Sequence, residues 1–447
     1  MPEPAEVVVV GAGLAGLACA RRLVASGVSV TVLERDDRAG GRVGTDVVDG
    51  FRCDRGFQLL NPAYPEVRRT LDLRALRLRP LPAGVVVATG AHRRLLADPR
   101  RTPPARLPRA FVGTLRTVHS PAEGAAFARW ALRAVRTHPA DLLAAPDEPW
   151  GSALDGMDIT GELRHEVLEP FLAGVIGERD GSTSRRYVDL LVRSFARGRP
   201  SVPWEGLQAV PDQLAAGLPD GCLQTGVRVE VVGPGRVRTA DGELKARAVV
   251  VATDPATAGD LLGIPVPASR GLTTFWHVAQ RPPTAAAELH LDGDGRGPVV
   301  NSVVLSTSAP SYAPDTRSLV ATTVLGAADD VRTEAAVRVQ LRYVYGADTR
   351  GWQLLRTHAL AHALTAMPPP LDVRRRVALG DGLFVAGDHR DSASVQGALV
   401  SGRRAADAVL GSLGLPVPPR SPLDAVRVLP PQPRPSASSG SRAGHAR

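Results

Sequence analysis

The sequence predicts an α/β protein of two domains, one built on a parallel sheet and the other of mixed α+β type. Three observations favour this fold. The chain of 447 residues exceeds the length over which one hydrophobic core keeps growing. Residues 7–10 are four valines, a run typical of a buried parallel strand. That run opens a strand, glycine turn, helix and strand within about thirty residues, which indicates a βαβ unit.

The βαβ unit carries a recognisable motif. Residues 11–16 read Gly-Ala-Gly-Leu-Ala-Gly and stand between the strand at 7–10 and a helical stretch. Residues 28–33 form the next strand, and Glu34 closes it. This order is the structural context required of the dinucleotide-binding fingerprint. It places Glu34 where its carboxylate can accept hydrogen bonds from ribose hydroxyls.

The spacing of the glycines has a chemical reason. Gly11 permits the tight turn, Gly13 lets the backbone approach a pyrophosphate, and Gly16 lets helix and strand pack closely. The helix begins with Leu14 and Ala15, and its first N–H groups carry a partial positive charge that suits phosphates. The fingerprint alone does not separate NAD from FAD.

The next segment separates them by resemblance. Residues 34–42 read Glu-Arg-Asp-Asp-Arg-Ala-Gly-Gly-Arg. Here the sequence resembles the flavoprotein superfamily of amine oxidases, phytoene desaturases and protoporphyrinogen oxidases, whose members carry an R-x-G-G-R element in this register. The resemblance implies FAD, with Arg35, Gly41 and Arg42 among its contacts. Gly40 and Gly41 would give a bare backbone turn beside the diphosphate, and Arg42 a charge-assisted hydrogen bond.

Three later segments extend the resemblance. Residues 54–61 match the stretch that lies along the isoalloxazine ring in relatives, and residues 227–253 match a strand pair that completes the cofactor domain. Residues 382–388 form a strand ending in an acid, followed by a helix whose N-terminus would stabilise charge on the reduced flavin. The implied FAD contacts are Gly56, Phe57, Gln58, Val229, Ala252, Thr253, Gly387, Asp388, Ser394, Val395 and Gln396.

The domains are therefore expected to be discontinuous. The predicted FAD-binding domain, Rossmann-like in fold, comprises residues 1–74, 204–265 and 373–414. The predicted substrate domain comprises residues 75–203 and 266–372. Its first segment is expected to be helical, with helices at 108–136, 159–174 and 185–197. Its second segment is expected to contain strands at 299–306 and 318–325. Residues 415–447 are rich in Pro, Ser, Arg and Gly without periodicity, which predicts a disordered tail. Residues 170–175 and 310–314 also resemble segments of uncharacterised superfamily members, with no chemistry attached.

Composition excludes several other classes of protein. The net charge is +9, but the charge is spread along the chain without an aromatic-interleaved basic block, so nucleic-acid binding is not expected. Cys19, Cys53 and Cys222 lie far apart, which predicts neither a disulfide framework nor a metal site and favours a reducing cytoplasmic setting. No stretch approaches the roughly 20 apolar residues needed to cross a bilayer.

One segment leaves contact with a membrane surface open. Residues 126–136 place arginines at helical spacing beside apolar positions. A basic amphipathic helix of this kind can lie on an anionic membrane, which would put the protein at the inner face of the membrane as a peripheral protein. The alternative interpretation is a solvated helix that packs on the substrate domain.

The reaction is inferred from what the chain lacks. Amine oxidases of the superfamily use a lysine that holds water against the flavin, whereas Lys245, the only lysine, falls on an outer strand of the cofactor domain. No cysteine lies between residues 382 and 403 to anchor a covalent flavin, so FAD is expected to be non-covalent. The resemblance then favours dehydrogenation or desaturation of an apolar, conjugated small molecule, isoprenoid- or tetrapyrrole-like.

No residue is assigned as a catalytic base. His389 could carry protons or merely cap a strand end. Two alternatives remain open: a flavin amine oxidase acting on a small amine, and a non-catalytic prenyl-group escort protein that has lost flavin. The presence of Arg42, Asp388 and the glycine set argues against the escort protein.

Overall fold

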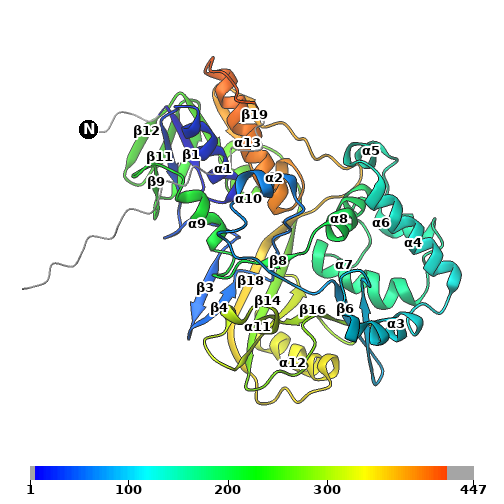
Figure 1. Ribbon diagram of the computed structural model, residues 1–447. Coiled ribbons are helices and arrows are strands. Elements are labelled where there is room, and N and C mark those ends of the chain that lie inside the picture. Colours follow the sequence, from blue (N-terminus) through cyan, green and yellow to red (C-terminus); the bar gives the residue numbers. More distant parts are fainter. Residues whose placement is uncertain (1–5, 420–447) are drawn as a thin grey trace, which may run out of the picture.

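A computed structural model describes residues 6–419 and contains two large sheets (Figure 1). The first has six strands, of which the central ones are parallel and buried. In sheet order, these strands are β19 (Ala378–Gly380), β20 (Leu383–Val385), β13 (Ala248–Val251), β1 (Val7–Val10), β2 (Val30–Leu33) and β9 (Leu223–Gln224). Only β19 pairs antiparallel, at one edge.

The two faces of this sheet are covered differently. Val7 and Val9 pack with α1 (Leu14–Ala25) and α13 (Val395–Ser412) on one face. The opposite face packs against an antiparallel sheet made of β10 (Val229–Gly233), β11 (Arg236–Thr239) and β12 (Gly242–Lys245). A Cβ on Gly402 of α13 would lie 2.1 Å from the Ala15 carbonyl oxygen, so glycine is what lets α13 approach α1.

The second large sheet has seven strands, with α12 (Val331–Tyr345) packed on one face. In sheet order its strands are β18 (Gln353–Thr365), β14 (Ser269–Ala279), β17 (Ser318–Leu325), β16 (Val299–Val304), β15 (Leu289–Asp292), β6 (Gly84–Thr89) and β7 (His92–Ala97). A helical region lies beside this sheet in Figure 1 and includes α4 (Pro121–Arg136), α7 (Glu169–Ile176) and α8 (Arg185–Arg197). Residues of this sheet and of α7 line the cavity that forms the candidate functional site.

Shorter elements connect these parts. The helices are α2 (Pro65–Thr70), α3 (Leu107–Leu115), α5 (Pro139–Ala144), α6 (Trp150–Asp155), α9 (Ala209–Ala215), α10 (Pro255–Leu262) and α11 (Leu305–Ser308), with single turns at Pro104–Arg106, Pro310–Tyr312 and Asp388–Arg390 and a π-helical segment at Leu163–Leu168. Two small ribbons pair β3 (Thr45–Val48) with β4 (Phe51–Asp54) and β5 (Arg79–Pro80) with β8 (Ser201–Val202).

The fold class predicted from the sequence is confirmed, and several elements have the predicted bounds. The strands at 7–10 and 318–325 and the helix at 185–197 match. The single helix predicted for 108–136 is wrong, because the structure has two. Ser120 Oγ accepts a hydrogen bond from Glu123 N at 3.3 Å and Pro121 follows it, which starts a new helix at α4.

Other bounds shift or lie outside the described chain. The helix expected from residue 159 starts at 163, as the π-helical segment that leads into α7. The strand expected at 28–33 begins at Val30. Of the tail predicted to be disordered, residues 420–447 lie outside the described residues. The domain bounds stay a prediction.

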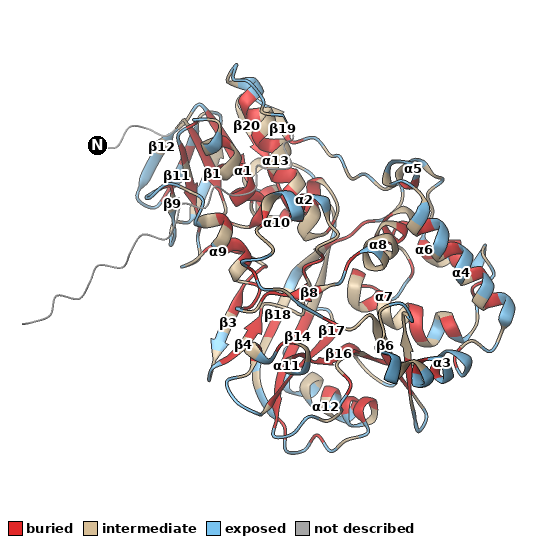
Figure 2. Ribbon diagram, in the orientation of Figure 1, coloured by how far each residue is buried: buried red, intermediate tan, exposed pale blue. Residues whose placement is uncertain are grey.

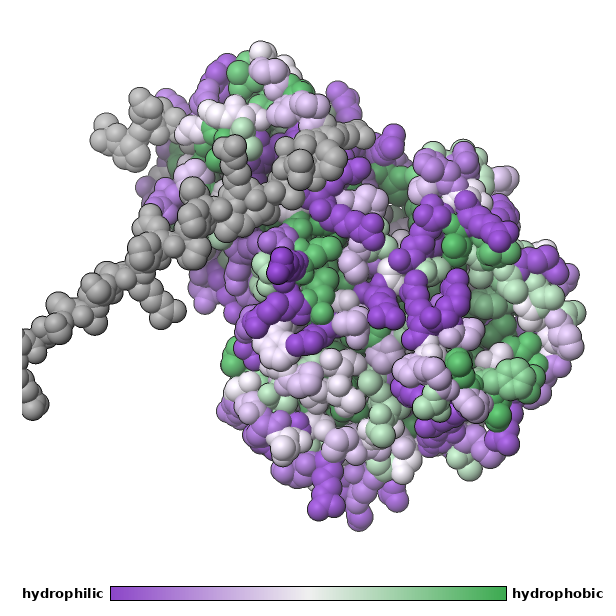
Figure 3. All heavy atoms as spheres, in the orientation of Figure 1, coloured by the Kyte–Doolittle hydropathy of each residue, from purple (hydrophilic) through white to green (hydrophobic). Residues whose placement is uncertain are grey.

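The basic amphipathic segment is packed rather than free. Figure 2 shows both buried and exposed stretches along α4. Ala126, Trp130 and Ala134 are buried, and Trp130 Nε1 donates to Asp189 Oδ1 of α8 at 2.6 Å. Over the helical region, the face seen in Figure 3 mixes hydrophilic and hydrophobic residues. No helix among residues 6–419 has the length and apolar character to cross a membrane. These contacts agree with the interpretation of a solvated helix that packs on neighbouring elements, and contact with a membrane surface stays a prediction.

Candidate functional site

One cavity of about 840 Å³ is lined by residues of both large sheets together with α7 and α8. Every residue that the sequence predicted to bind FAD lines this cavity except Gly16 and Gln396. The structure thus brings together blocks of the chain that are hundreds of residues apart. Whether each one contacts FAD stays a prediction.

The glycine turn forms one end of the cavity. Gly11 has φ +101°, and a Cβ there would lie 3.0 Å from the Ala252 carbonyl oxygen. Gly16 lies behind the turn, where a Cβ would be 2.0 Å from the Gly11 oxygen, so its role is packing. A Cβ on Gly13 would meet nothing within 4 Å, and no side chain caps α1 there. The open space over an uncapped helix N-terminus fits a diphosphate.

Glu34 lies at the end of β2 and is buried. Its Oε2 accepts a hydrogen bond from Ala12 N at 2.7 Å, and its Oε1 accepts one from Asp36 N at 3.0 Å. These bonds fix the carboxylate in orientation at the cavity wall. Each carboxylate oxygen can accept a second hydrogen bond, so the predicted contact with ribose hydroxyls remains available.

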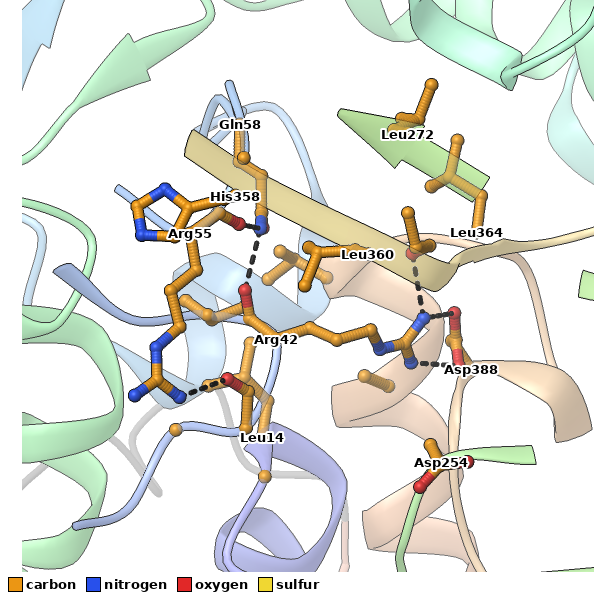
Figure 4. Close-up of a pocket in the computed structure, with 18 of the residues that line it drawn as sticks. Leu14, Arg42, Arg55, Gln58, Asp254, Leu272, His358, Leu360, Leu364 and Asp388 are labelled. Carbon is orange, nitrogen blue, oxygen red and sulfur yellow. Dashed lines mark hydrogen bonds and ion pairs between the residues drawn. The ribbon is translucent and has the colours of Figure 1, made fainter. Parts of the chain in front are cut away.

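Arg42 and Asp388 join the first and last blocks of the chain (Figure 4). Arg42 Nη2 donates to Asp388 Oδ1 at 2.6 Å, and Nη1 donates to Asp388 Oδ2 at 3.1 Å and to the Ala363 oxygen at 3.0 Å. Burial alone would lower the pKa of Arg42, but the contact with Asp388 outweighs it and the pKa is raised. Asp388 is only 4% exposed, and Arg42 supplies the opposite charge that a buried carboxylate needs as a partner.

The predicted segment at 54–61 is tied to the same turn. Gln58 Nε2 donates to the Arg42 oxygen at 2.7 Å and to the Arg55 oxygen at 2.8 Å, and Arg55 Nη1 donates to the Gly41 oxygen at 3.2 Å (Figure 4). The sequence interpretation did not single out Arg55. It lines the cavity and holds the backbone of the Gly-Gly-Arg turn in place.

Two residues with suggested roles face elsewhere. Gln396 does not line the cavity, and its Oε1 accepts a hydrogen bond from Glu66 N of α2 at 2.9 Å. His389 is fully buried outside the cavity lining, and neither ring nitrogen has a hydrogen-bond partner among the described residues. Burial lowers the pKa of His389 to about 4, so the ring is neutral at physiological pH. It is not placed to carry protons for the cavity.

We call the lining residues around the glycine turn the cofactor-side wall: Gly11, Gly13, Glu34, Arg35, Gly41, Arg42 and Asp388. A second part of the lining, which the sequence interpretation missed, has a different character. We call it the uncharged wall, and it is formed by α7, α8, β15, β16 and β17 through Phe171, Gly174, Val175, Phe195, Leu289, Asn301 and Thr323.

The uncharged wall explains one of the segments without assigned chemistry. Phe171, Gly174 and Val175 belong to residues 170–175, and their i, i+3, i+4 spacing places them on one face of α7. The other such segment is structural. Its Tyr312 is buried and donates to Asp54 Oδ2 at 2.8 Å. Burial raises the pKa of Asp54 to about 6.

An Asp–His pair also lines the cavity. His358 Nε2 is 2.9 Å from Asp46 Oδ2, and both residues line the cavity. Burial lowers the pKa of His358, although Asp46 opposes the shift. A neutral imidazole that donates Nε2–H to Asp46 leaves Nδ1 as an acceptor. Among the described residues there is no cluster of His, Cys, Asp or Glu that could hold a metal ion.

A dinucleotide-type sheet that shares a cavity with a second sheet is the arrangement expected of a flavin-dependent oxidoreductase. The chain belongs to the family of flavin containing amine oxidoreductases, whose model matches residues 14–410. The resemblance drawn from the motifs is thereby confirmed.

Individual relatives agree with the family but differ in what they act on. The chain is 60% identical over 55 residues to phytoene dehydrogenase of Streptomyces griseus (12% of this chain, 11% of the relative) and 49% identical over 67 residues to putrescine oxidase of Kocuria rosea (15% and 14%). It is 44% identical over 72 residues to protoporphyrinogen oxidase 2 of Arabidopsis thaliana (16% and 14%). The matched segments span only a small part of each relative, so these names do not fix a substrate.

Solved structures support the fold over nearly the whole chain. An oxidoreductase from Methanosarcina mazei has a TM-score of 0.69 at 16% identity and covers 89% of this chain and 99% of that one. Cyclohexylamine oxidase from Brevibacterium oxydans has a TM-score of 0.64 at 18% identity and covers 92% and 100%. At this identity the likeness concerns the fold.

Proposed function

We propose that the protein oxidises a neutral, largely apolar small molecule by hydride transfer to non-covalently bound FAD. The observation that carries this proposal is the uncharged wall. None of its residues bears a charge, and only Asn301 and Thr323 are polar. An ammonium group held there would be desolvated without a counter-charge, which costs several kcal/mol, whereas an apolar molecule would gain from burial.

The remaining residues have supporting roles in this proposal. FAD supplies the redox chemistry by accepting a hydride. The α1 N-terminus at Gly13 would hold its diphosphate and Glu34 its ribose, in a site formed by residues 1–74, 204–265 and 373–414. The apolar side chains Phe171 and Phe195, whose rings are 5.5 Å apart, would exclude water from the reacting carbon. All three cysteines are buried and none lines the cavity, which supports non-covalent binding.

The two alternatives find less support. Lys245 is exposed on β12 and does not line the cavity, so it cannot hold water against a flavin bound there. The presence of the bidentate pair of Arg42 and Asp388 at the cavity favours the flavoprotein over a flavin-free escort protein.

The proposal is tested by spectroscopy of the purified protein. A yellow protein with flavin absorbance that survives dialysis but is released on denaturation would show tight, non-covalent FAD. Under anaerobic conditions, a panel of isoprenoids, porphyrinogens and amines should bleach the flavin only with neutral apolar members. Bleaching by simple amines alone, or a colourless protein that refuses added FAD, would overturn it.

A further inference from the structure

Four strands of the seven-stranded sheet place polar residues in one transverse row. His358 of β18 is the register partner of Thr274 of β14, Thr274 is the partner of Thr323 of β17, and Thr323 is the partner of Asn301 of β16. All four residues line the cavity. Since strands lie about 4.8 Å apart, the row extends over about 14 Å.

The two halves of this row differ in hydrogen bonding. His358 is bonded to Asp46, and Thr274 Oγ1 accepts a hydrogen bond from Phe57 N at 3.1 Å. By contrast, the side chains of Asn301 and Thr323 make no hydrogen bond with any residue of the described chain, although each is only 3% exposed. A buried polar group without a partner is costly, so such groups in native proteins usually have a water or ligand partner.

The surroundings of this pair indicate what kind of partner it takes. A Cβ on Gly174 would lie 1.9 Å from Asn301 Nδ2, so the backbone of α7 comes close to the amide. The other members of the uncharged wall are apolar. An amide and a hydroxyl can both donate and accept hydrogen bonds, but they offer no counter-charge.

We propose that Asn301 and Thr323 bind a single neutral hydrogen-bonding group of the substrate, such as a hydroxyl or carbonyl oxygen. This inference rests on the proposed function and narrows it. The substrate is an apolar molecule that carries one neutral polar group, held on the uncharged wall away from the cofactor-side wall. It is neither a pure hydrocarbon nor a cation.

The test uses three probes of one carbon skeleton: geraniol, the corresponding hydrocarbon without the hydroxyl group, and geranylamine. Titration calorimetry of the full-length holoprotein should show geraniol binding about three- to tenfold more tightly than the hydrocarbon, as expected for one neutral hydrogen bond. Two shape-matched variants, Asn301→Leu and Thr323→Val, should each reduce this preference to less than twofold. Binding of the hydrocarbon should be unchanged.

Thr322→Val is the matched control. Thr322 is buried on the same strand, but its hydroxyl is bonded to Ser302 Oγ at 2.9 Å and it does not line the cavity. Thr322→Val should therefore lower the midpoint of urea unfolding and leave the preference for geraniol intact. Thr323→Val should do the reverse, because it removes a hydroxyl that has no protein partner.

Specific outcomes would overturn this inference. The inference is wrong if the wild-type protein binds geraniol no more tightly than the hydrocarbon, or if it binds geranylamine more tightly than geraniol. It is also wrong if Thr323→Val lowers the stability of the protein but keeps the preference for geraniol. Flavin absorbance is recorded on the same samples. Protein that holds FAD but fails the ligand test contradicts only this inference, whereas protein that cannot hold FAD contradicts the proposed function.

Discussion

The two walls of the cavity are built on opposite principles. The cofactor-side wall consists of glycines and charged side chains, and hydrogen bonds fix the positions of Glu34, Arg42 and Asp388. The uncharged wall consists of side chains from five separate elements that share only their lack of charge. We therefore expect binding of the cofactor and choice of substrate to be separable, so that changes in one wall leave the proposed function of the other intact.

The largest effects are expected from substitutions in the glycine turn, where Gly16→Ala should lower the stability of the protein and Gly13→Ala should lower its affinity for FAD. Gly16→Ala would force a Cβ to 2.0 Å from the Gly11 oxygen, and we expect it to cost about 3 kcal/mol of unfolding free energy. Gly13→Ala adds its methyl group to open space, so stability should change by less than about 1 kcal/mol. Its methyl group would, however, occupy the place proposed for the diphosphate.

Urea unfolding and fluorescence titration with FAD distinguish the two variants. Gly13→Ala should weaken FAD binding at least tenfold in a protein of normal stability. If Gly13→Ala binds FAD as the wild type does, the diphosphate lies elsewhere and the cofactor-side wall is wrongly placed.

The ion pair comes next in size. Arg42→Met removes the charge partner of Asp388, which is 4% exposed, and should cost about 3 kcal/mol of unfolding free energy because an uncompensated buried charge remains. The double variant with Asp388→Asn should recover part of that loss, which a double-mutant cycle by urea unfolding would measure. FAD affinity should fall in both. An additive cycle would mean that the pair is not coupled.

The difference between the two walls also explains which parts of the cavity could be predicted from the sequence. The glycine spacing of residues 11–16 and the position of Glu34 predicted one end of the cavity, because backbone geometry and charge within a short stretch are legible in a sequence. Arg35, Gly41, Arg42 and Asp388 were expected from the resemblance to the superfamily, and their contact with FAD stays a prediction. Lining and core residues of the uncharged wall look alike in sequence, as Phe171 lines the cavity while its neighbour Leu172 is buried in the core. One residue that could have indicated the uncharged wall from the sequence is Asn301, because it is polar and lies in the buried, valine-rich strand β16.

His389 makes the region behind the cofactor-side wall sensitive to acid. Its pKa of about 4 lies below the ordinary value, so below about pH 6.5 the unfolded chain binds a proton that the native protein does not. Stability from this residue is therefore lost as pH falls from 6.5 towards 4. We expect His389→Leu to gain about 2 kcal/mol relative to wild type between pH 7 and pH 5.

Urea unfolding at the two pH values measures this gain, and His389→Gln is the control. Glutamine also removes the titrating group, so His389→Gln should show the same gain in stability between pH 7 and pH 5. At pH 7 it should be less stable than His389→Leu, because its amide is polar and the site is buried. A gain that does not depend on pH would mean that protonation of His389 does not oppose folding.

A charge placed on the uncharged wall tests whether substrate choice resides there. Val175 is half-buried at the cavity, and Val175→Asp should strengthen geranylamine binding about tenfold, or about 1.4 kcal/mol, by supplying a counter-charge. Val175→Asn, of equal size but neutral, should not. Calorimetry gives the affinities, and FAD binding should be unchanged in both. Loss of FAD from Val175→Asp would show that the two walls are not independent.

The smallest effect is expected on the outer surface of α4. Arg129, Arg133 and Arg136 are exposed, but Trp130 on another side of the helix is buried and bonded to Asp189 of α8, so we expect that side to stay packed and not to enter lipid. Three arginines contribute about 1 kcal/mol each only when they lie within about 8 Å, one Debye length at physiological salt, of an anionic surface. Replacing all three by Gln should therefore change sedimentation with anionic vesicles by less than twofold at physiological salt. Salt-resistant binding of the wild type that this variant loses would contradict this expectation, because it would require α4 to separate from α8.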